Sequence, residues 1–74
     1  MSGGQPAEVR MGNDIARQFA HLPEDDAVAA IAAHVRRFWS PPMRGALARL
    51  ADQDPDAMDP LLVRAASTLA ASPD

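Results

Sequence analysis

Proline placement is the feature of this sequence that most constrains its fold. Proline lacks an amide proton and its ring clashes with the preceding helical turn, so a helix accepts it only in its first turn. Pro23, Pro42 and Pro60 each precede a run of helical periodicity and suit a first helical position, and Asp59 stands where an N-cap would. No segment shows strand-like alternation. The sequence therefore predicts an all-α fold, a small array of about four short helices.

The expected helices cover residues 7–21, 23–39, 42–51 and 60–71, with an acidic loop over 52–56. In the first helix, Met11, Ile15 and Phe19 recur at the spacing of one helical face. Gly12 weakens that helix by up to about 1 kcal/mol relative to Ala, or it lets another backbone approach closely. Pro41 precedes a proline and is therefore expected to be extended rather than helical.

The length of the chain and its lack of cysteine limit how it can be stabilised. The 74 residues are expected to form one domain over 7–71, between a disordered segment 1–6 and a loose tail 72–74. Such a short chain buries only about 60% of its unfolded surface, so its stability alone is marginal. The absence of cysteine excludes disulfides, thiolate zinc sites and iron–sulfur ligation. Reinforcement must come from a partner or from very efficient helix packing.

Charge and hydropathy narrow the class of protein. The formal net charge is −3 and every basic side chain is Arg. An acidic total argues against nucleic-acid binding, which depends on neutralising phosphates, whereas the planar Arg group suits ion pairs at protein interfaces. No apolar run approaches the roughly 20 residues of a membrane span, and the N-terminus lacks a signal-peptide pattern. We expect a soluble, cytoplasmic protein.

The residues that could carry chemistry do not form a catalytic pattern. His34 could in principle pair with Asp14 or Arg17 across a helix interface as an acid–base pair. A single His beside an apolar stripe is, however, ordinarily a packed structural residue. The aspartates of segment 52–59 lack the glycine and terminal Glu of a calcium-binding loop. We therefore expect no catalytic, cofactor-binding or metal-binding residue in this chain.

The segment 38–44 gathers most of the side chains that favour protein recognition. It contains the only Trp, one of the two Phe, a Met and an Arg, and Trp, Met and Arg are enriched in interfaces. Adjacent helical residues point about 100° apart, so Phe38 and Trp39 cannot both face one narrow seam. Trp39 and Arg44 are less expected to pack in the core than Phe38. An exposed aromatic residue beside an Arg and a rigid turn predicts a docking anchor here.

Several segments together resemble the delta subunit of NAD-dependent formate dehydrogenase. They are Arg-Met-Gly-Asn-Asp-Ile-Ala at 10–16, Phe19, the helical segment 27–35 with His34, and Phe-Trp-Ser-Pro-Pro-Met-Arg at 38–44. The sequence departs from the family pattern at four positions. Gly12 and Asp14 replace Ala and Gln, Gln18 stands where an aromatic residue is common, and Ser40 replaces Asp.

The resemblance implies a small accessory subunit of a soluble, cytoplasmic formate dehydrogenase. In such complexes the alpha subunit oxidises formate at a molybdenum bis-pterin centre. Electrons then pass through iron–sulfur clusters to FMN in the beta subunit and reduce NAD, and a gamma subunit completes the chain. The delta subunit carries no redox group and is expected to support assembly or stability by docking on the alpha subunit.

The expected protein-interface residues come from three of the predicted helices and the turn at 38–44. They are Arg10, Asn13, His34, Phe38, Trp39, Met43 and Arg44. Two other functions remain open. The chain could be a transient maturation chaperone for molybdenum cofactor insertion. It could also be a small helix-turn-helix regulator, because a short turn joins the second and third helices, although its net charge of −3 is unfavourable for DNA binding.

Overall fold

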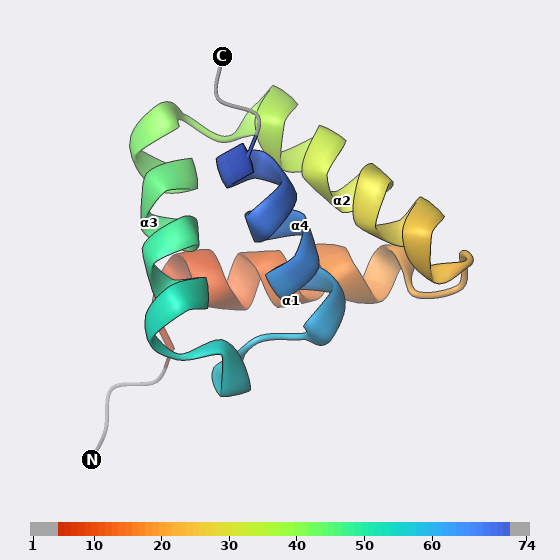
Figure 1. Ribbon diagram of the computed structural model, residues 1–74, viewed down its shortest axis with the longest axis horizontal. Helices are drawn as coiled ribbons and strands as arrows, with labels where there is room; N and C mark the ends of the chain where they lie inside the picture. The colour runs from red at the N-terminus through yellow and green to blue at the C-terminus, as the bar shows by residue number, and fades with distance from the viewer. Residues whose placement is uncertain (1–4, 72–74) are drawn as a thin grey trace.

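Four α-helices make up most of the chain. The computed structural model describes residues 5–71, and Figure 1 shows the arrangement of the helices. They are α1 (Ala7–Phe19), α2 (Glu24–Phe38), α3 (Pro41–Gln53) and α4 (Pro60–Ala71), with a short 3-10 helix, η1 (Pro55–Ala57), before α4. The described residues contain no strand, so the all-α prediction is confirmed. The predicted tail, and the predicted N-terminal segment except for its last two residues, lie outside the described residues.

The prolines mark helix starts as predicted, but two of the three lie one position away from the first helical residue. Pro60 opens α4, and its N-cap Asp59 accepts a hydrogen bond at Oδ1 from the Leu61 amide, with an N–O distance of 2.9 Å. The prediction of an Asp N-cap is confirmed. Pro23 was expected to be the first residue of α2 but is its N-cap, so the helix begins one residue later than predicted. The ψ angle of Pro23, 150°, is outside the helical region.

The expectation that Pro41 would be extended is wrong. Pro41 and Pro42 are the first two residues of α3. The first amides of a helix have no acceptor within it, so two residues without amide protons lose no hydrogen bond there. Ser40 is the N-cap, and its hydroxyl oxygen accepts from the Met43 amide at 3.4 Å. The extended residues of this turn are Trp39 and Ser40, and α3 begins earlier than predicted.

The helices pack into a flat molecule measuring 37 × 28 × 19 Å. α4 packs most extensively on α2 and next on α3, and α1 contacts all three other helices. In Figure 1, α4 lies at the centre of the view, between α2 and α3, and crosses α1. None of the helices in the described part of the chain has the length and apolarity required to cross a membrane.

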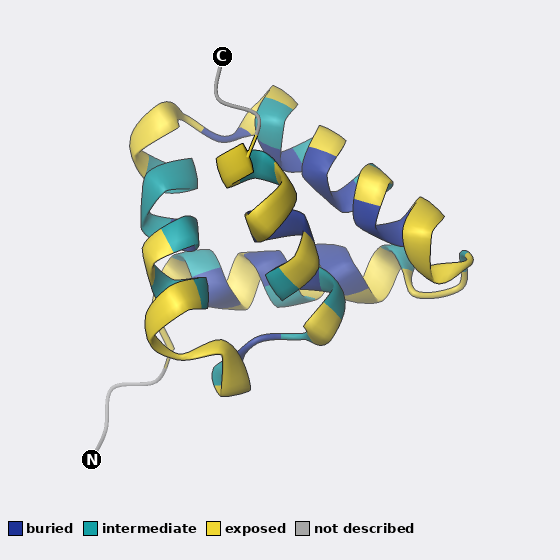
Figure 2. Ribbon diagram, in the orientation of Figure 1, coloured by how far each residue is buried: buried dark blue, intermediate teal, exposed yellow. Residues whose placement is uncertain are grey.

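The core lies where the inner faces of the helices meet, as the dark-blue segments of Figure 2 show. Ile31, Val35, Leu47 and Leu62 are its largest fully buried side chains. The rest of the core cluster is Val9, Ile15, Ala16, Val28, Ala32, Trp39, Met58, Ala65 and Ala66. Much of this core is alanine, which lets the helix axes approach closely and makes a small volume of side chains sufficient.

Gly12 is buried where α1 meets α4. The close approach that the sequence allowed at this glycine is present, but the neighbour is a side chain and not another backbone. Leu62 of α4 fills the space that a Cβ at position 12 would occupy.

Candidate protein-docking surface

The two aromatic residues at the turn between α2 and α3 differ sharply in their exposure to solvent. Phe38, the last residue of α2, is 66% exposed, whereas Trp39 is 6% exposed. The prediction that one of the pair lies outside the core is confirmed. The expectation that Trp39 would be the outer one is wrong. Trp39 is the C-cap and has extended angles, φ −96° and ψ 143°, so the 100° step between helical residues does not apply to it.

Phe38 belongs to a cluster of three rings, which we call the aromatic patch: Phe19, His34 and Phe38. The His34 and Phe38 ring centroids are 4.8 Å apart in a tilted arrangement, and those of Phe19 and His34 are 6.5 Å apart, edge to face. His34 and Phe38 are neighbours because they stand four residues apart on α2. Both were predicted site residues. Phe19 was not, because its contact depends on how α1 packs against α2.

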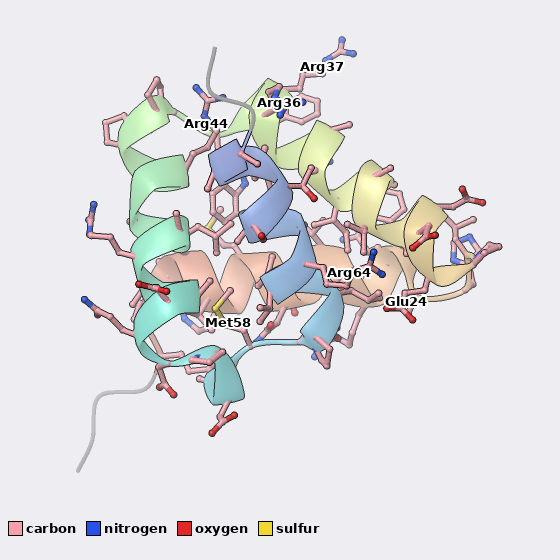
Figure 3. All side chains as sticks on the ribbon, viewed as in Figure 1. Glu24, Arg36, Arg37, Arg44, Met58 and Arg64 are labelled. Atoms are coloured by element: carbon pink, nitrogen blue, oxygen red, sulfur yellow. The ribbon has the colours of Figure 1, made fainter. Side chains whose placement is uncertain are left out.

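One arginine contacts the aromatic patch, and two others lie at the same end of the molecule (Figure 3). The guanidinium carbon of Arg37 lies 5.5 Å from the centroid of the Phe38 ring, within the range of a cation–π contact. Figure 3 shows Arg36, Arg37 and Arg44 at the end of the molecule where α2 stops and α3 starts. We call these three residues the arginine corner. None of them has an ion pair with an acidic group of the described residues.

Arg36 and Arg44 are both half-buried, but Arg44 differs from the other two arginines in having a buried nitrogen atom. Its Nε is buried and has no hydrogen-bond acceptor among the described residues. Burying a donor without an acceptor is unfavourable, because the donor loses its water. Arg44 was a predicted site residue, and its Nε is the atom that sets it apart from the other two arginines.

The other predicted site residues lie outside the aromatic patch and the arginine corner. Asn13 binds within the chain: its Nδ2 donates to the Ala57 carbonyl at 3.3 Å, and its Oδ1 accepts from the Asp59 amide at 2.8 Å. Met43 is half-buried against the core, and Arg10 is exposed on α1. The interface assignment of all seven residues stays a prediction.

Acidic groups gather at the other end of α2. Arg64 of α4 donates to Glu24 at 2.7 Å and to Asp25 at 3.0 Å, both in the first turn of α2. The hydrogen bond to Asp25, followed by that to Glu24, raises the pKa of the Arg64 guanidinium. Figure 3 shows this pairing well away from the arginine corner. α2 therefore starts with acids that share one arginine and ends with arginines that have no ion pair among the described residues.

A shallow apolar groove runs between α3 and α4. Alanines and Val63 form most of its lining, with Arg49, Asp52 and Ser67 as its polar members. The alanines are Ala48, Ala51, Ala66 and Ala70. In the described residues no group of three or more His, Asp or Glu side chains is placed to hold a metal ion.

Comparison with known proteins gives one match. The sequence pattern of the family described as NADH-dependant formate dehydrogenase delta subunit FdsD matches residues 9–66. No curated protein and no solved structure matches the chain significantly. The matched region contains the aromatic patch, the arginine corner and Asn13, and it covers most of the 74 residues. The resemblance seen in the sequence is thereby confirmed, and the chain belongs to the formate dehydrogenase delta subunit family.

Proposed function

We propose that this chain is a non-catalytic accessory subunit of a cytoplasmic formate dehydrogenase complex. It docks on the molybdenum-containing alpha subunit and supports the assembly or stability of the complex, which also contains beta and gamma subunits. The molybdenum bis-pterin, iron–sulfur clusters, FMN and NAD belong to those other subunits. Membership of the delta subunit family supports this proposal.

The observation that carries the docking role is the exposure of Phe38. A ring that is 66% exposed leaves much of its apolar surface in water. Phe38 does not stand alone, because His34 extends the same surface and the Arg37 guanidinium lies over the ring. Aromatic and Arg side chains together are typical of the centres of protein interfaces.

The surroundings of His34 support a structural role for this residue. Its contacts are the phenyl rings of Phe19 and Phe38. Among the described residues, no hydrogen bond or ion pair joins His34 to Asp14 or to any other acid. Asp14 pairs with Arg17 on its own helix. The acid–base pairs considered from the sequence are therefore not assembled, and His34 serves as part of an apolar surface.

Co-purification tests the proposal. A tagged chain is expressed with the genes of the complete complex, and the retained proteins are identified and their molybdenum is measured. We expect the alpha subunit at one copy per tagged chain in active enzyme. A tagged chain that never retains a molybdenum-containing formate dehydrogenase would refute the proposal. Recovery only with cofactor-free alpha subunit, and loss from the mature enzyme, would instead indicate a maturation chaperone.

A matched pair of variants locates the contact. Phe38→Ala removes the exposed ring, and Met11→Ala removes another exposed apolar side chain, 42% exposed on α1. Met11 lies two turns of α1 before Phe19 and therefore about 12 Å from it along the helix axis. We expect Phe38→Ala to reduce retention of the alpha subunit and Met11→Ala to leave it unchanged. Equal retention by both variants would show that docking uses another surface.

A further inference from the structure

The arginine corner concentrates positive charge on a chain that is negative overall. Arg36, Arg37 and Arg44 lie within one turn of the α2–α3 junction, while the formal net charge of the chain is −3. The described acids that form ion pairs do so elsewhere, with Arg17 and Arg64. An external anionic group would therefore gain the most favourable electrostatic interaction at the arginine corner.

Arg44 is the arginine of this corner whose guanidinium is partly held against the protein. Its Nε is buried and without an acceptor in the described part of the chain. The two terminal nitrogens of a planar guanidinium form a pair of parallel donors, which match the two oxygens of a carboxylate. A carboxylate placed against the terminal nitrogens of Arg44 would pair with a guanidinium that is already held in place and would balance its charge in one contact.

We propose that the arginine corner and the aromatic patch together bind an acidic segment of a partner protein. An Asp or Glu carboxylate of that segment accepts from Arg44, and an adjacent apolar side chain covers Phe38 and His34. This proposal rests on the proposed function, because it specifies the chemistry of the alpha-subunit surface that the delta subunit recognises.

The charge distribution of the chain favours a protein segment over a nucleic acid as the occupant. A polyanion would meet the net negative charge of the whole chain, including the acidic end of α2. A single carboxylate meets only the local positive charge of the corner. The exposed Phe38 ring beside the arginines also calls for an apolar neighbour, which an acidic peptide segment can supply in the adjoining residue.

The test measures binding of the purified full-length chain to the purified alpha subunit at several salt concentrations. Arg44→Gln removes the charge and the paired donors. Arg49→Gln is the matched control, because Arg49 is an exposed arginine of the same helix. We expect Arg44→Gln to weaken binding at least about tenfold and Arg49→Gln to change it by less than about twofold. Arg44→Lys restores the charge without the paired donors and should rescue binding only in part.

Salt dependence and chemical protection supply independent readouts. Binding of the unmodified chain should weaken more between 50 and 500 mM salt (roughly, a threefold fall in Debye length) than binding of Arg44→Gln. Phenylglyoxal labelling followed by mass spectrometry should show Arg44 and Arg37 protected in the complex and Arg49 still reactive. Trp39 fluorescence checks that every variant is folded.

The outcomes separate this inference from the proposed function. Failure of the unmodified chain to bind the alpha subunit overturns both. Binding that depends on Phe38 but changes by less than about twofold in Arg44→Gln, with no difference in salt dependence, overturns the acidic-segment proposal alone. Loss of binding in Arg49→Gln but not in Arg44→Gln assigns the interface to the α3–α4 groove. Arg44-dependent binding of duplex DNA would likewise overturn the assignment to a protein segment.

Discussion

Gly12 on α1 faces Leu62 on α4 so closely that a Cβ added to Gly12 would lie 2.6 Å from the Leu62 Cδ2 atom and 2.9 Å from Cδ1. Leu62 is fully buried, so its end cannot turn into solvent to make room. The contact brings the two helices together at a place where most residues would hold them apart. It also explains why a residue that weakens α1 is found in the middle of it.

The first prediction is that Gly12→Ala destabilises the protein. Overpacking of a filled core costs about 1–3 kcal/mol, which outweighs the helix-propensity gain of up to about 1 kcal/mol. Chemical denaturation followed by circular dichroism measures the free energy of unfolding. Leu62→Val in the same chain should relieve the clash, so the effects of the two changes should be non-additive by about 1 kcal/mol.

Gly45→Ala is the control for this prediction. Gly45 is also inside a helix, but a Cβ there would meet only Arg49 Nη1 at 3.8 Å, an ordinary contact. The substitution should therefore stabilise the protein by up to about 1 kcal/mol. If Gly12→Ala were stabilising to the same extent as Gly45→Ala, the packing of α1 on α4 described above would be incorrect.

The second prediction concerns Asn13, which ties α1 to the segment before α4. Asn13→Ala removes both hydrogen bonds, to the Ala57 carbonyl and from the Asp59 amide. Because these groups are part-buried, we expect a loss of about 1–3 kcal/mol in the free energy of unfolding. Gln5→Ala removes a second side-chain hydrogen bond to the Ala57 carbonyl, but an exposed one at 3.0 Å, and should cost less than about 0.5 kcal/mol.

Asn13→Asp distinguishes the contributions of the two hydrogen bonds to stability. It keeps an acceptor for the Asp59 amide and removes the donor to Ala57, so its effect should fall between those of the parent and Asn13→Ala. Denaturation curves of the three proteins under identical conditions give the comparison. Equal stability of all three would mean that Asn13 is free for contact with a partner, as the sequence had suggested.

Helix positions were predictable because their signals are local. Pro60 and Asp59 mark the start of α4 through the conformations and hydrogen bonds of neighbouring residues. The role of Asn13 was not predictable in this way. Its partners lie 44 and 46 residues further along the chain, so no local pattern indicates whether its amide faces a partner protein or the loop before α4.

The candidate site was predictable in location but not in orientation. Composition placed the docking signal at the α2–α3 turn, where Phe38 and the arginines are indeed exposed or half-buried. The sequence predicted Trp39 as the outer residue and Phe38 as the inner one, whereas the structure has the reverse. Helical spacing does not hold at Trp39, because its extended backbone ends the helix. The contribution of Phe19 required knowledge of how α1 packs against α2.

The third prediction concerns the ion pairs of Arg64. Hydrogen bonds to Asp25 and Glu24 raise the pKa of Arg64 above its ordinary value. A raised pKa means that the stabilisation is fully present below the unfolded value and is lost only as the pH rises through the folded value. The stability difference between the parent and Arg64→Gln should therefore be the same at pH 7 and pH 10.

Salt, unlike pH in this range, should change that difference. The Arg64, Glu24 and Asp25 side chains are all exposed, and pairs of this kind are weakened by screening. We expect Arg64→Gln to lower the melting temperature slightly at low salt and not at all in 1 M sodium chloride. Arg49→Gln, which removes an arginine without an ion pair among the described residues, should show no such salt dependence. A difference that persists at high salt would indicate that Arg64 acts through packing.

The fourth prediction contrasts Trp39 with Phe38. Trp39 is 6% exposed in the core, so Trp39→Phe should leave a cavity and cost about 1 kcal/mol or more. Phe38→Ala removes a larger part of a side chain, but one that is 66% exposed, and should cost less than about 1 kcal/mol, including its contact with Arg37. Denaturation followed by circular dichroism measures both changes. Fluorescence of the single Trp gives a second test: iodide should quench it poorly in the folded parent and in Phe38→Ala alike, and strong quenching in the folded protein would place Trp39 on the surface instead.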